Sequence, residues 1–419
     1  MIQDPRAPRR MPALARVASV LALAALLPFA LSCQPGAKRT VVFWQFWQPE
    51  LIDPLIAKFE EENPGIDVQV EQLTWGSGRE KIFAAIASDS VPDLCELGST
   101  WMPRMLEGGA LVDWSAGLAD LKPTLRGWSL CSIGDAIYGV PWMLGTRALF
   151  YNKALFARAG LDSSRAPETW DQLYAAAAAI DRLGAGVHGY GVQAGESQVL
   201  FKKFMPYAWG NGGRVLGDAL ETSEFDSPRN VEALEFYLRL KDVGVVERQQ
   251  ALDRMFKAGA IGLQISGAWL FRSIPRDAPD LRYGVALVPR PSRERGTHAS
   301  FAGGELLVSF DASKNKEDAL KLARFLVRPD NALALSAAAK NVQPATLNAD
   351  TAAYYRERPQ EQTMLHQFET AVTAPNHPAW EDMEAAIEQQ VEEALHGRKS
   401  AAQAVADAHA KIQELVGQR

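Results

Sequence analysis

The chain has 419 residues, of which 47% are hydrophobic and 22% are charged. This composition is typical of a globular protein, and the length is sufficient for two or three hydrophobic cores. The formal net charge is −6, and the basic residues are scattered along the chain rather than clustered. We therefore expect no nucleic-acid partner, because nucleic-acid binding calls for a concentrated basic patch.

The amino terminus has the pattern of a secretory signal peptide. Four arginines lie within the first 16 residues, and residues 17–31 form an almost uninterrupted apolar run. A run this short favours a signal peptide over residues 1–32, because a membrane span needs about 20 apolar residues. Small residues precede Cys33, as in a bacterial lipobox, where the cysteine is acylated. We expect an exported protein, in the periplasm or on the cell surface, anchored to the membrane by a lipid on Cys33; the alternative is ordinary cleavage nearby.

The remaining cysteines and the histidines bear on disulfides and metal sites. Cys95 and Cys131 either form a disulfide, which an exported protein can retain, or stay as two buried thiols. Both readings remain open, because the sequence does not give the distance between the two Cα atoms. No C-x-x-C motif is present and the six histidines lie far apart, so we expect neither a metal site nor a cofactor.

The first hundred residues after the signal alternate between strand and helix patterns. β-branched and aromatic residues predict a strand over 40–46, and apolar residues at helical spacing predict a helix over 49–62. The alternation continues as strand 66–70, helix 78–87, strand 92–97 and helix 101–107. This βαβαβα order is typical of an α/β protein with a parallel sheet, in which ligands bind beyond the carboxyl ends of the strands.

The rest of the chain adds two extended pieces and several helices. Residues 138–151 contain two extended pieces joined by Gly145 and Thr146. Asn152 can cap a helix that runs to residue 159, and Thr169 opens an alanine-rich helix with a capping box. Further helices are predicted over 231–241, 316–326, 380–395 and 400–416. No linker separates two halves of the chain, which indicates lobes built from discontinuous segments.

Seven short blocks follow one another behind the predicted signal. They include Tyr-Gly-Val-Pro at residues 138–141, Trp-Gly-Asn-Gly-Gly at 209–213 and Ser-Gly-Ala-Trp at 266–269. In this order the blocks resemble the extracellular solute-binding protein family that includes maltose-binding protein. The seven blocks lie within residues 59–68, 92–101, 138–153, 209–213, 266–269, 301–304 and 378–400.

The resemblance implies a two-lobe fold like that of type II periplasmic binding proteins. The amino-terminal lobe would contain residues 36–145 and 305–346, and the carboxy-terminal lobe residues 146–304 and 347–419. The hinge would lie near Gly145, Gly303 and Pro344, and glycines suit such points because they absorb large φ/ψ changes. The resemblance further implies a monomer without catalytic residues, which captures a carbohydrate between its lobes and delivers it to the permease of an ABC transporter.

A carbohydrate site needs flat aromatic surfaces and polar groups aimed at hydroxyls. Trp269 and Trp380 resemble the positions where the family stacks sugar rings, although any single tryptophan can instead pack in a core. Glu96 and Arg147 can also be read as a structural ion pair. Arg79 could serve an acidic sugar or be a solvated helix residue, and we favour the solvated residue. The complete set of ligand-binding candidates is Gln45, Trp47, Gln48, Trp75, Glu96, Ser99, Trp101, Trp142, Arg147, Trp209, Asn211, Gly212, Trp269, Gly303, Gly304, Asn341 and Trp380.

Three other functions fit parts of the sequence. An exported glycoside hydrolase would also use aromatic residues and carboxylates, but the chain has no G-x-S-x-G or H-E-x-x-H motif. The same fold could hold a polyamine, a metal or a phosphorylated alcohol, and the third alternative is a structural lipoprotein. Residues 184–189 match G-x-G-x-x-G but follow a helix rather than a strand, so we interpret them as a turn.

Overall fold

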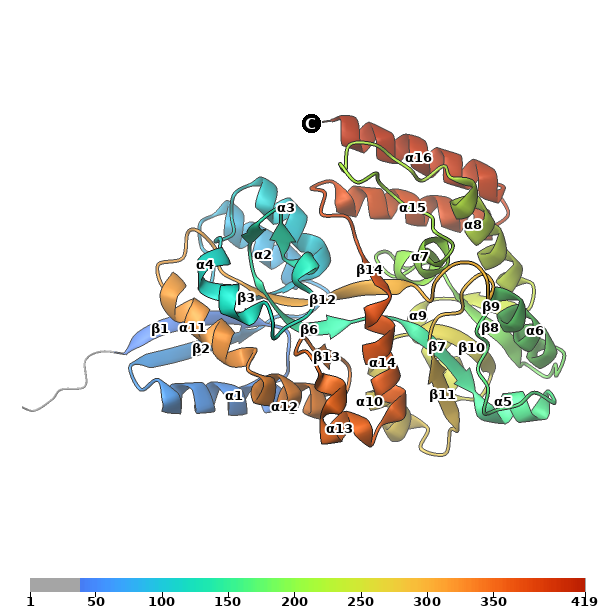
Figure 1. Ribbon diagram of the computed structural model, residues 1–419, viewed down its shortest axis with the longest axis horizontal. Coiled ribbons are helices and arrows are strands. Elements are labelled where there is room, and N and C mark those ends of the chain that lie inside the picture. Colours follow the sequence, from blue (N-terminus) through green and yellow to red (C-terminus); the bar gives the residue numbers. More distant parts are fainter. Residues whose placement is uncertain (1–37, 419) are drawn as a thin grey trace, which may run out of the picture.

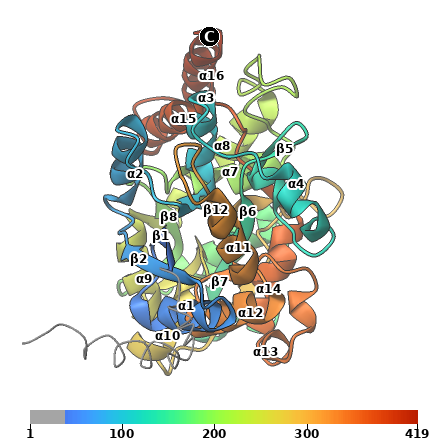
Figure 2. The ribbon, with the colours of Figure 1, turned by 90° about the vertical axis from the view of Figure 1, so that its left-hand side faces the viewer.

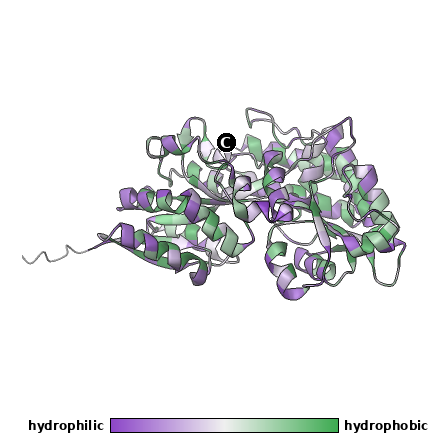
Figure 3. Ribbon diagram, turned by 60° about the horizontal axis from the view of Figure 1, so that its bottom comes forward, coloured by the Kyte–Doolittle hydropathy of each residue, from purple (hydrophilic) through white to green (hydrophobic). Residues whose placement is uncertain are grey.

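The computed structural model describes residues 38–418, so the predicted signal peptide and Cys33 lie outside the described residues. Two α/β lobes lie side by side along the long axis of the molecule (Figure 1). The strands inside each lobe are largely apolar, whereas polar residues mark the outer sides of many helices (Figure 3). None of the helices in residues 38–418 combines the length and the apolar character that a membrane span requires.

The first hundred described residues alternate strands and helices, as the sequence predicts. They form β1 (Arg39–Gln45), α1 (Pro49–Glu62), β2 (Ile66–Gln72), α2 (Gly78–Ala87), β3 (Leu94–Gly98), α3 (Met102–Glu107) and α4 (Ser115–Leu118). β1 pairs in parallel with both β2 and β3. The carboxyl ends of these strands therefore meet at one edge of the sheet, where residues that follow them gather.

Later segments of the chain complete the sheet of this amino-terminal lobe. The strand order is β13-β6-β12-β3-β1-β2, and β12 runs antiparallel to β3 and β6. α1 lies beside α12, although far from it in sequence (Figures 1 and 2). The added elements are β6 (Val140–Gly145), β12 (Ser300–Val308), α11 (Lys316–Leu326), α12 (Pro329–Ala339) and β13 (Gln343–Pro344), with a small hairpin of β4 (Ser132–Ile133) and β5 (Ala136–Ile137).

The carboxy-terminal lobe has its own sheet, of order β11-β7-β10-β8-β9. Its strands are β7 (Ala148–Asn152), β8 (His188–Gln193), β9 (Gly244–Glu247), β10 (Ile261–Ser266) and β11 (Tyr283–Ala286). α15 and α16 pack against each other and against α8 (Figure 1). The helices are α5 (Lys153–Arg158), α6 (Trp170–Asp181), α7 (Phe201–Gly210), α8 (Pro228–Lys241), α9 (Gln249–Lys257), α10 (Trp269–Asp277), α13 (Ala353–Arg356), α14 (Pro359–Glu369), α15 (Trp380–Leu395) and α16 (Ala401–Gly417).

Polar side chains fix where several of these helices begin. The Asn152 side chain accepts hydrogen bonds from two backbone N–H groups of α5. Thr169 accepts one from the Gln172 N–H at the start of α6, and Ser400 accepts one from the Gln403 N–H at the start of α16. These caps satisfy N–H groups that the first turn of a helix leaves without a carbonyl partner. The caps predicted at Asn152 and Thr169 are confirmed.

β12 belongs to both halves of the molecule. Its first residues pair with β14 (Ala371–Thr373), whereas Gly303 and Gly304 pair with Gly145 and Leu144 of β6. A Cβ on Gly304 would lie 2.3 Å from the Met143 carbonyl oxygen, so this close approach requires glycine. The chain thus passes between the lobes at β12 and again between β6 and β7.

Hydrophobic cores form separately on the two sides of these crossings. One cluster draws on buried residues from 41–144 and 306–345, and another draws on residues from 149–301 and 380–416. Cys95 and Cys131 are buried in the first cluster as free thiols. The disulfide considered for them is therefore absent, and the alternative of two buried thiols holds.

Candidate functional site

Three polar side chains form a wall on the amino-terminal lobe, which we call the acidic wall: Gln45, Glu96 and Glu305. Glu305 pairs with Gly98 across the β12–β3 ladder, and Glu96 pairs with Leu307. The two carboxylates are therefore diagonal neighbours on one face of the sheet. Gln45 ends β1, which runs parallel to β3, so its side chain joins them at the carboxyl ends of the strands.

Each residue of the acidic wall has a buried polar atom with no hydrogen-bond partner among residues 38–418. These atoms are Gln45 Nε2, Glu96 Oε1 and Glu305 Oε2. The other oxygen of Glu96 accepts a 2.7 Å bond from the Phe46 N–H, and Gln45 Oε1 accepts one from the Trp47 N–H. Buried polar groups almost always find partners, so an unpartnered set at one sheet edge indicates a place for a polar ligand.

Two indoles beside the acidic wall continue this pattern. The rings of Trp47 and Trp142 meet edge to face with centroids 6.1 Å apart. Both rings are buried, and neither indole N–H has a hydrogen-bond partner in the described part of the chain. The two N–H groups add donors to a site whose carboxylates are acceptors.

Three cations form the opposing wall on the carboxy-terminal lobe, which we call the basic wall: Arg147, Lys202 and Lys203. The Arg147 guanidinium carbon lies 4.8 Å from the ring centroid of Trp269 and 5.7 Å from that of Phe301. Lys202 Nζ lies 5.2 Å from the Phe301 centroid, and Lys203 Nζ lies 5.1 Å from the Trp269 centroid. Cations at these distances are attracted to aromatic rings, so the two rings hold the basic wall in place.

Trp269 is fixed from behind by Asp253. The indole N–H donates a 2.7 Å bond to Asp253 Oδ2, while Oδ1 accepts bonds from Gln249, Gln264 and Ser266. A Cβ on Gly267 would lie 1.9 Å from the Trp269 ring, so only glycine allows the ring to lie against this turn. Trp269 thus presents its ring to Arg147 and Lys203.

Burial shifts the pKa values of both walls toward neutral forms. Burial raises the pKa of Glu96 well above its usual range, and the neighbouring Glu305 carboxylate raises it further. Burial also raises the pKa of Glu305 to about 7, although Arg147 and Lys202 act in the opposite direction. On the basic wall, burial lowers the pKa of Arg147 to about 10 and that of Lys203 well below its ordinary value. The site is therefore poorly hydrated, and polar contacts within it are strong.

The rim of the site joins the two lobes through Arg79 and Glu381. Arg79 donates two bonds to the Glu381 carboxylate, of 2.8 and 2.5 Å, and Arg104 lies 3.6 Å from the same carboxylate. The pKa of Arg79 is raised by its bond to Glu381. Arg79 therefore forms an ion pair that joins α2 of one lobe to α15 of the other. The prediction that Arg79 is a solvated residue of a helix was wrong. Asn376 adds two bonds to the backbone of Ser129 and Ser132.

The remaining aromatic candidates lie at different depths. Trp75 stacks on Phe46 with centroids 4.2 Å apart and remains 52% exposed, and Trp101 lies 5.5 Å from Trp75. Trp380 is 1% exposed and meets Phe201 edge to face. Trp75 is thus the candidate indole with a face open to a ligand, whereas Trp380 packs at the lobe interface.

The glycine and serine candidates act through the backbone of the crossing. The Gly304 N–H donates a 3.2 Å bond to Ser99 Oγ. A Cβ on Gly303 would lie 2.5 Å from the Phe301 ring, so glycine at this position lets Phe301 reach the cations of the basic wall. The two glycines and Ser99 therefore position the site at the point where β12 leaves one lobe for the other.

Several candidates are placed away from the two walls. Asn211 is buried, and its side-chain N–H donates to the Arg229 carbonyl and to Glu232. The neighbouring Gly212 is exposed in a turn with φ of 81°. Both residues directly follow α7, and Asn211 Oδ1 has no hydrogen-bond partner among residues 38–418. Gln48 is exposed before α1, Trp209 packs against Phe201, and Asn341 follows α12.

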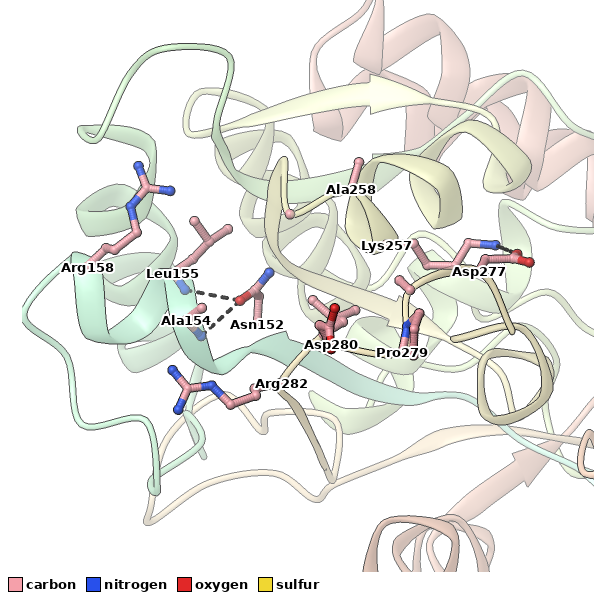
Figure 4. Close-up of a pocket in the computed structure, with 13 residues that line it drawn as sticks. Asn152, Ala154, Leu155, Arg158, Lys257, Ala258, Asp277, Pro279, Asp280 and Arg282 are labelled. Carbon is pink, nitrogen blue, oxygen red and sulfur yellow. Dashed lines mark hydrogen bonds and ion pairs between the residues drawn. The ribbon is translucent and has the colours of Figure 1, made fainter. Parts of the chain in front are cut away.

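A separate cavity of about 550 Å³ lies in the carboxy-terminal lobe (Figure 4). Asn152 uses its side-chain oxygen there to cap α5, and Lys257 pairs with Asp277 at 2.5 Å. None of the predicted site residues lines this cavity. Among residues 38–418, no cluster of His, Cys, Asp and Glu could hold a metal ion.

Four residues of the site were missed by sequence reasoning: Glu305, Lys202, Lys203 and Asp253. Glu305 directly follows the Gly303-Gly304 block, so its position beside that block was an available signal. The two lysines form an adjacent pair in a helix that is otherwise strongly apolar, which was a weaker signal. Asp253 lies on α9 among charged residues of a surface helix, and nothing in its sequence context distinguishes it.

Comparisons with known proteins agree with this architecture. A family model described as bacterial extracellular solute-binding protein matches residues 47–333. A binding protein of Brucella abortus (strain 2308) is 30% identical over 332 residues, which cover 75% of this chain and 77% of that protein. The sn-glycerol-3-phosphate-binding periplasmic protein of Escherichia coli O1:K1 is 26% identical over 337 residues, with coverage of 74% and 75%.

A solved structure carries the same fold over most of the chain. It is an ABC transporter solute-binding protein from Thermotoga lettingae, bound with alpha-D-tagatose. The TM-score is 0.80 at 28% identity, and the match covers 91% of this chain and 100% of that one. The predicted α/β fold with two lobes of the type II periplasmic-binding-protein kind is confirmed. The chain belongs to the bacterial extracellular solute-binding protein family.

Proposed function

We propose that this protein binds a carbohydrate between its lobes and delivers it to the permease of an ABC transporter. The observation that carries the proposal is the set of unpartnered buried polar atoms on facing walls. Glu96 Oε1, Glu305 Oε2 and Gln45 Nε2 lie on one wall, and Arg147 Nε lies on the other. A carbohydrate offers a rim of hydroxyls, each of which both donates and accepts hydrogen bonds, and can satisfy all of them.

Without a ligand, the buried polar groups of the site lack hydrogen-bond partners among residues 38–418, which costs free energy. Leaving one buried polar group without a partner costs about 1–3 kcal/mol, and more when the group is charged. A polyhydroxy ligand recovers that cost on binding, whereas an apolar ligand of the same shape does not. The exposed face of Trp75 supplies an apolar surface of the kind that sugar C–H groups contact.

Closure of the lobes is the mechanism that we propose for capture. The walls belong to different lobes, so the ligand touches both only in the closed form and shifts the population toward it. The Arg79–Glu381 pair and the Asn376 bonds form in the same closed arrangement. The closed surface is then what a permease would recognise.

The remaining assignments follow from the family and the division of the cores. We assign residues 36–145 and 305–346 to one lobe and residues 146–304 and 347–419 to the other, because the two main hydrophobic clusters divide at these crossings. An extracellular solute-binding protein is exported, and we assign the signal to residues 1–32 and the lipid anchor to Cys33. The chain acts as a monomer and without a catalytic step.

A ligand screen tests the proposal. Thermal shift of the purified protein against mono-, di- and trisaccharides, polyols and polyamines should give a rise in melting temperature with a saccharide. Ligand at about 100 times its Kd adds about 2.7 kcal/mol to the folded state. Chromogenic glycosides should be neither cleaved nor consumed.

Two results would contradict the proposal. A rise in melting temperature with polyamines alone would agree with the fold but would contradict carbohydrate binding. If the protein cleaves a glycoside and the Glu96→Gln variant does not, the acidic wall has a catalytic role. Glu414→Gln on α16 is a matched control, because Glu414 is exposed and contacts nearby Lys411 and Gln418.

A further inference from the structure

The three cations of the basic wall lack ion-pair partners. Arg147, Lys202 and Lys203 take part in no ion pair with any of residues 38–418, although carboxylates lie at longer range. Lys203 is 2% exposed and donates a hydrogen bond to the Ile265 carbonyl at 3.0 Å. Lysine and arginine are rarely buried unless they are paired, so this wall departs from the usual arrangement.

The surrounding carboxylates offset this positive charge only from a distance, and none of them forms a direct ion pair with the basic wall among residues 38–418. The Asp253 oxygens are occupied by Trp269, Gln249, Gln264 and Ser266. Glu388 accepts bonds from two backbone N–H groups, those of Gln198 and Phe201. Burial raises the pKa of both Glu305 and Glu384 to about 7, so near neutral pH these two carry only part of their charge.

The cations also repel one another. Arg147 and Lys202 share the Phe301 ring, and Arg147 and Lys203 share the Trp269 ring. Burial lowers the pKa of both lysines, and the nearby Arg147 lowers it further, as expected for like charges. A compact anion between Arg147 and Lys202 would remove this repulsion and give Arg147 Nε its missing acceptor.

We propose that Arg147, Lys202 and Lys203 form a subsite for an anionic group on the bound carbohydrate, either a carboxylate or a phosphate. The inference rests on the proposed carbohydrate function and narrows it to an acidic sugar or a sugar phosphate. Arg147 and Lys202 contact the anion, whereas Lys203 lies against the Trp269 ring and supports it. The acidic wall contains no cation, so the ligand lies in one orientation with its hydroxyl end toward Glu96 and Glu305.

Isothermal titration calorimetry with matched sugars tests the subsite. Each set contains one neutral sugar, its uronate or aldonate, and its phosphate ester, for glucose, galactose, mannose and maltose. In at least one set we expect the acidic member to bind 10-fold or more tightly than the neutral one at low salt. This advantage should shrink as salt is raised, because salt screens charge contacts.

Variants locate the effect on the basic wall. Lys202→Gln should weaken binding of the acidic member about 10-fold more than binding of the neutral member, and Lys202→Arg should restore most of the loss. Lys411→Gln carries the same charge change on α16 of the same lobe and should leave all affinities unchanged.

The outcomes separate this inference from the proposed function. If neutral sugars bind and no acidic member binds more tightly than its neutral counterpart, the subsite is overturned while carbohydrate binding stands. If no sugar of any kind binds, both fail. A preference for the carboxylate or for the phosphate supports the subsite either way and identifies which anion it takes.

Discussion

The two walls of the site are built in different ways. The acidic wall stands on three adjacent strands, and the diagonal placement of Glu96 and Glu305 follows from their pairing register. The basic wall stands on a chain crossing and on α7, and aromatic rings rather than backbone pairing hold its cations. The difference indicates that the acidic wall holds its hydrogen-bonding groups rigidly in place. The position of the basic wall depends instead on side-chain packing.

Removing a carboxylate from the rigid wall should have the largest effect. In Glu96→Gln we expect the affinity for the cognate ligand to fall by up to about 100-fold, because a buried polar group of the ligand that loses its partner costs about 1–3 kcal/mol. Calorimetry measures the affinity, and far-UV circular dichroism checks the fold. A loss of affinity smaller than 3-fold would show that Glu96 does not contact the ligand.

Trp269 tests whether the second wall depends on ring packing. In Trp269→Ala we expect about a 10-fold loss of affinity, because Arg147 loses a cation–π contact worth about 0.5–2 kcal/mol. If Trp269 acts through Arg147, the double variant with Arg147→Gln should bind no more weakly than Arg147→Gln alone. Additive losses would instead mean that Trp269 contacts the sugar itself, as the family resemblance implied.

The interlobe pair tests how far the walls depend on closure. Arg79→Glu should weaken ligand binding about 3- to 5-fold, because it turns an attraction in the closed form into a repulsion. The swap Arg79→Glu with Glu381→Arg should recover most of the affinity. Small-angle scattering without ligand should show a larger radius of gyration for the single variant than for the swap. Equal radii in all three proteins would exclude a role in closure.

The smallest expected effect is a change of stability with pH that arises from Glu384. This side chain faces Lys202, Glu381, Glu388 and Trp380. Burial raises its pKa in the folded protein to about 7 from an ordinary 4.5. A raised pKa stabilises the fold fully below the unfolded value, and that contribution is lost as pH rises through the folded value. Melting temperature should therefore fall by a few degrees between about pH 4.5 and 7, and less in Glu384→Gln. A parallel fall in both proteins would contradict this assignment.

Sequence reasoning succeeded where a local pattern determines the structure. The strands and helices of the first hundred described residues, and the cap at Asn152, follow from periodicity and turn chemistry. It failed where a contact joins distant segments: Arg79 meets Glu381 across 302 positions of sequence. The lysines of α7 escaped notice for the same reason, because their importance depends on Phe301 and Trp269, which come much later in the chain.

The continuity of β12 has a consequence for the length of the cargo. Phe301 and Glu305 lie on the same face of one strand, four residues apart, which corresponds to about 13 Å between their Cα atoms. Phe301 holds the cations and Glu305 belongs to the opposing wall, so the backbone itself fixes the spacing between the two ends of the ligand. A register slip of one residue would turn both of them to the opposite face. Homologues that carry longer or shorter cargo are therefore expected to change the surrounding loops and to keep the register of this strand.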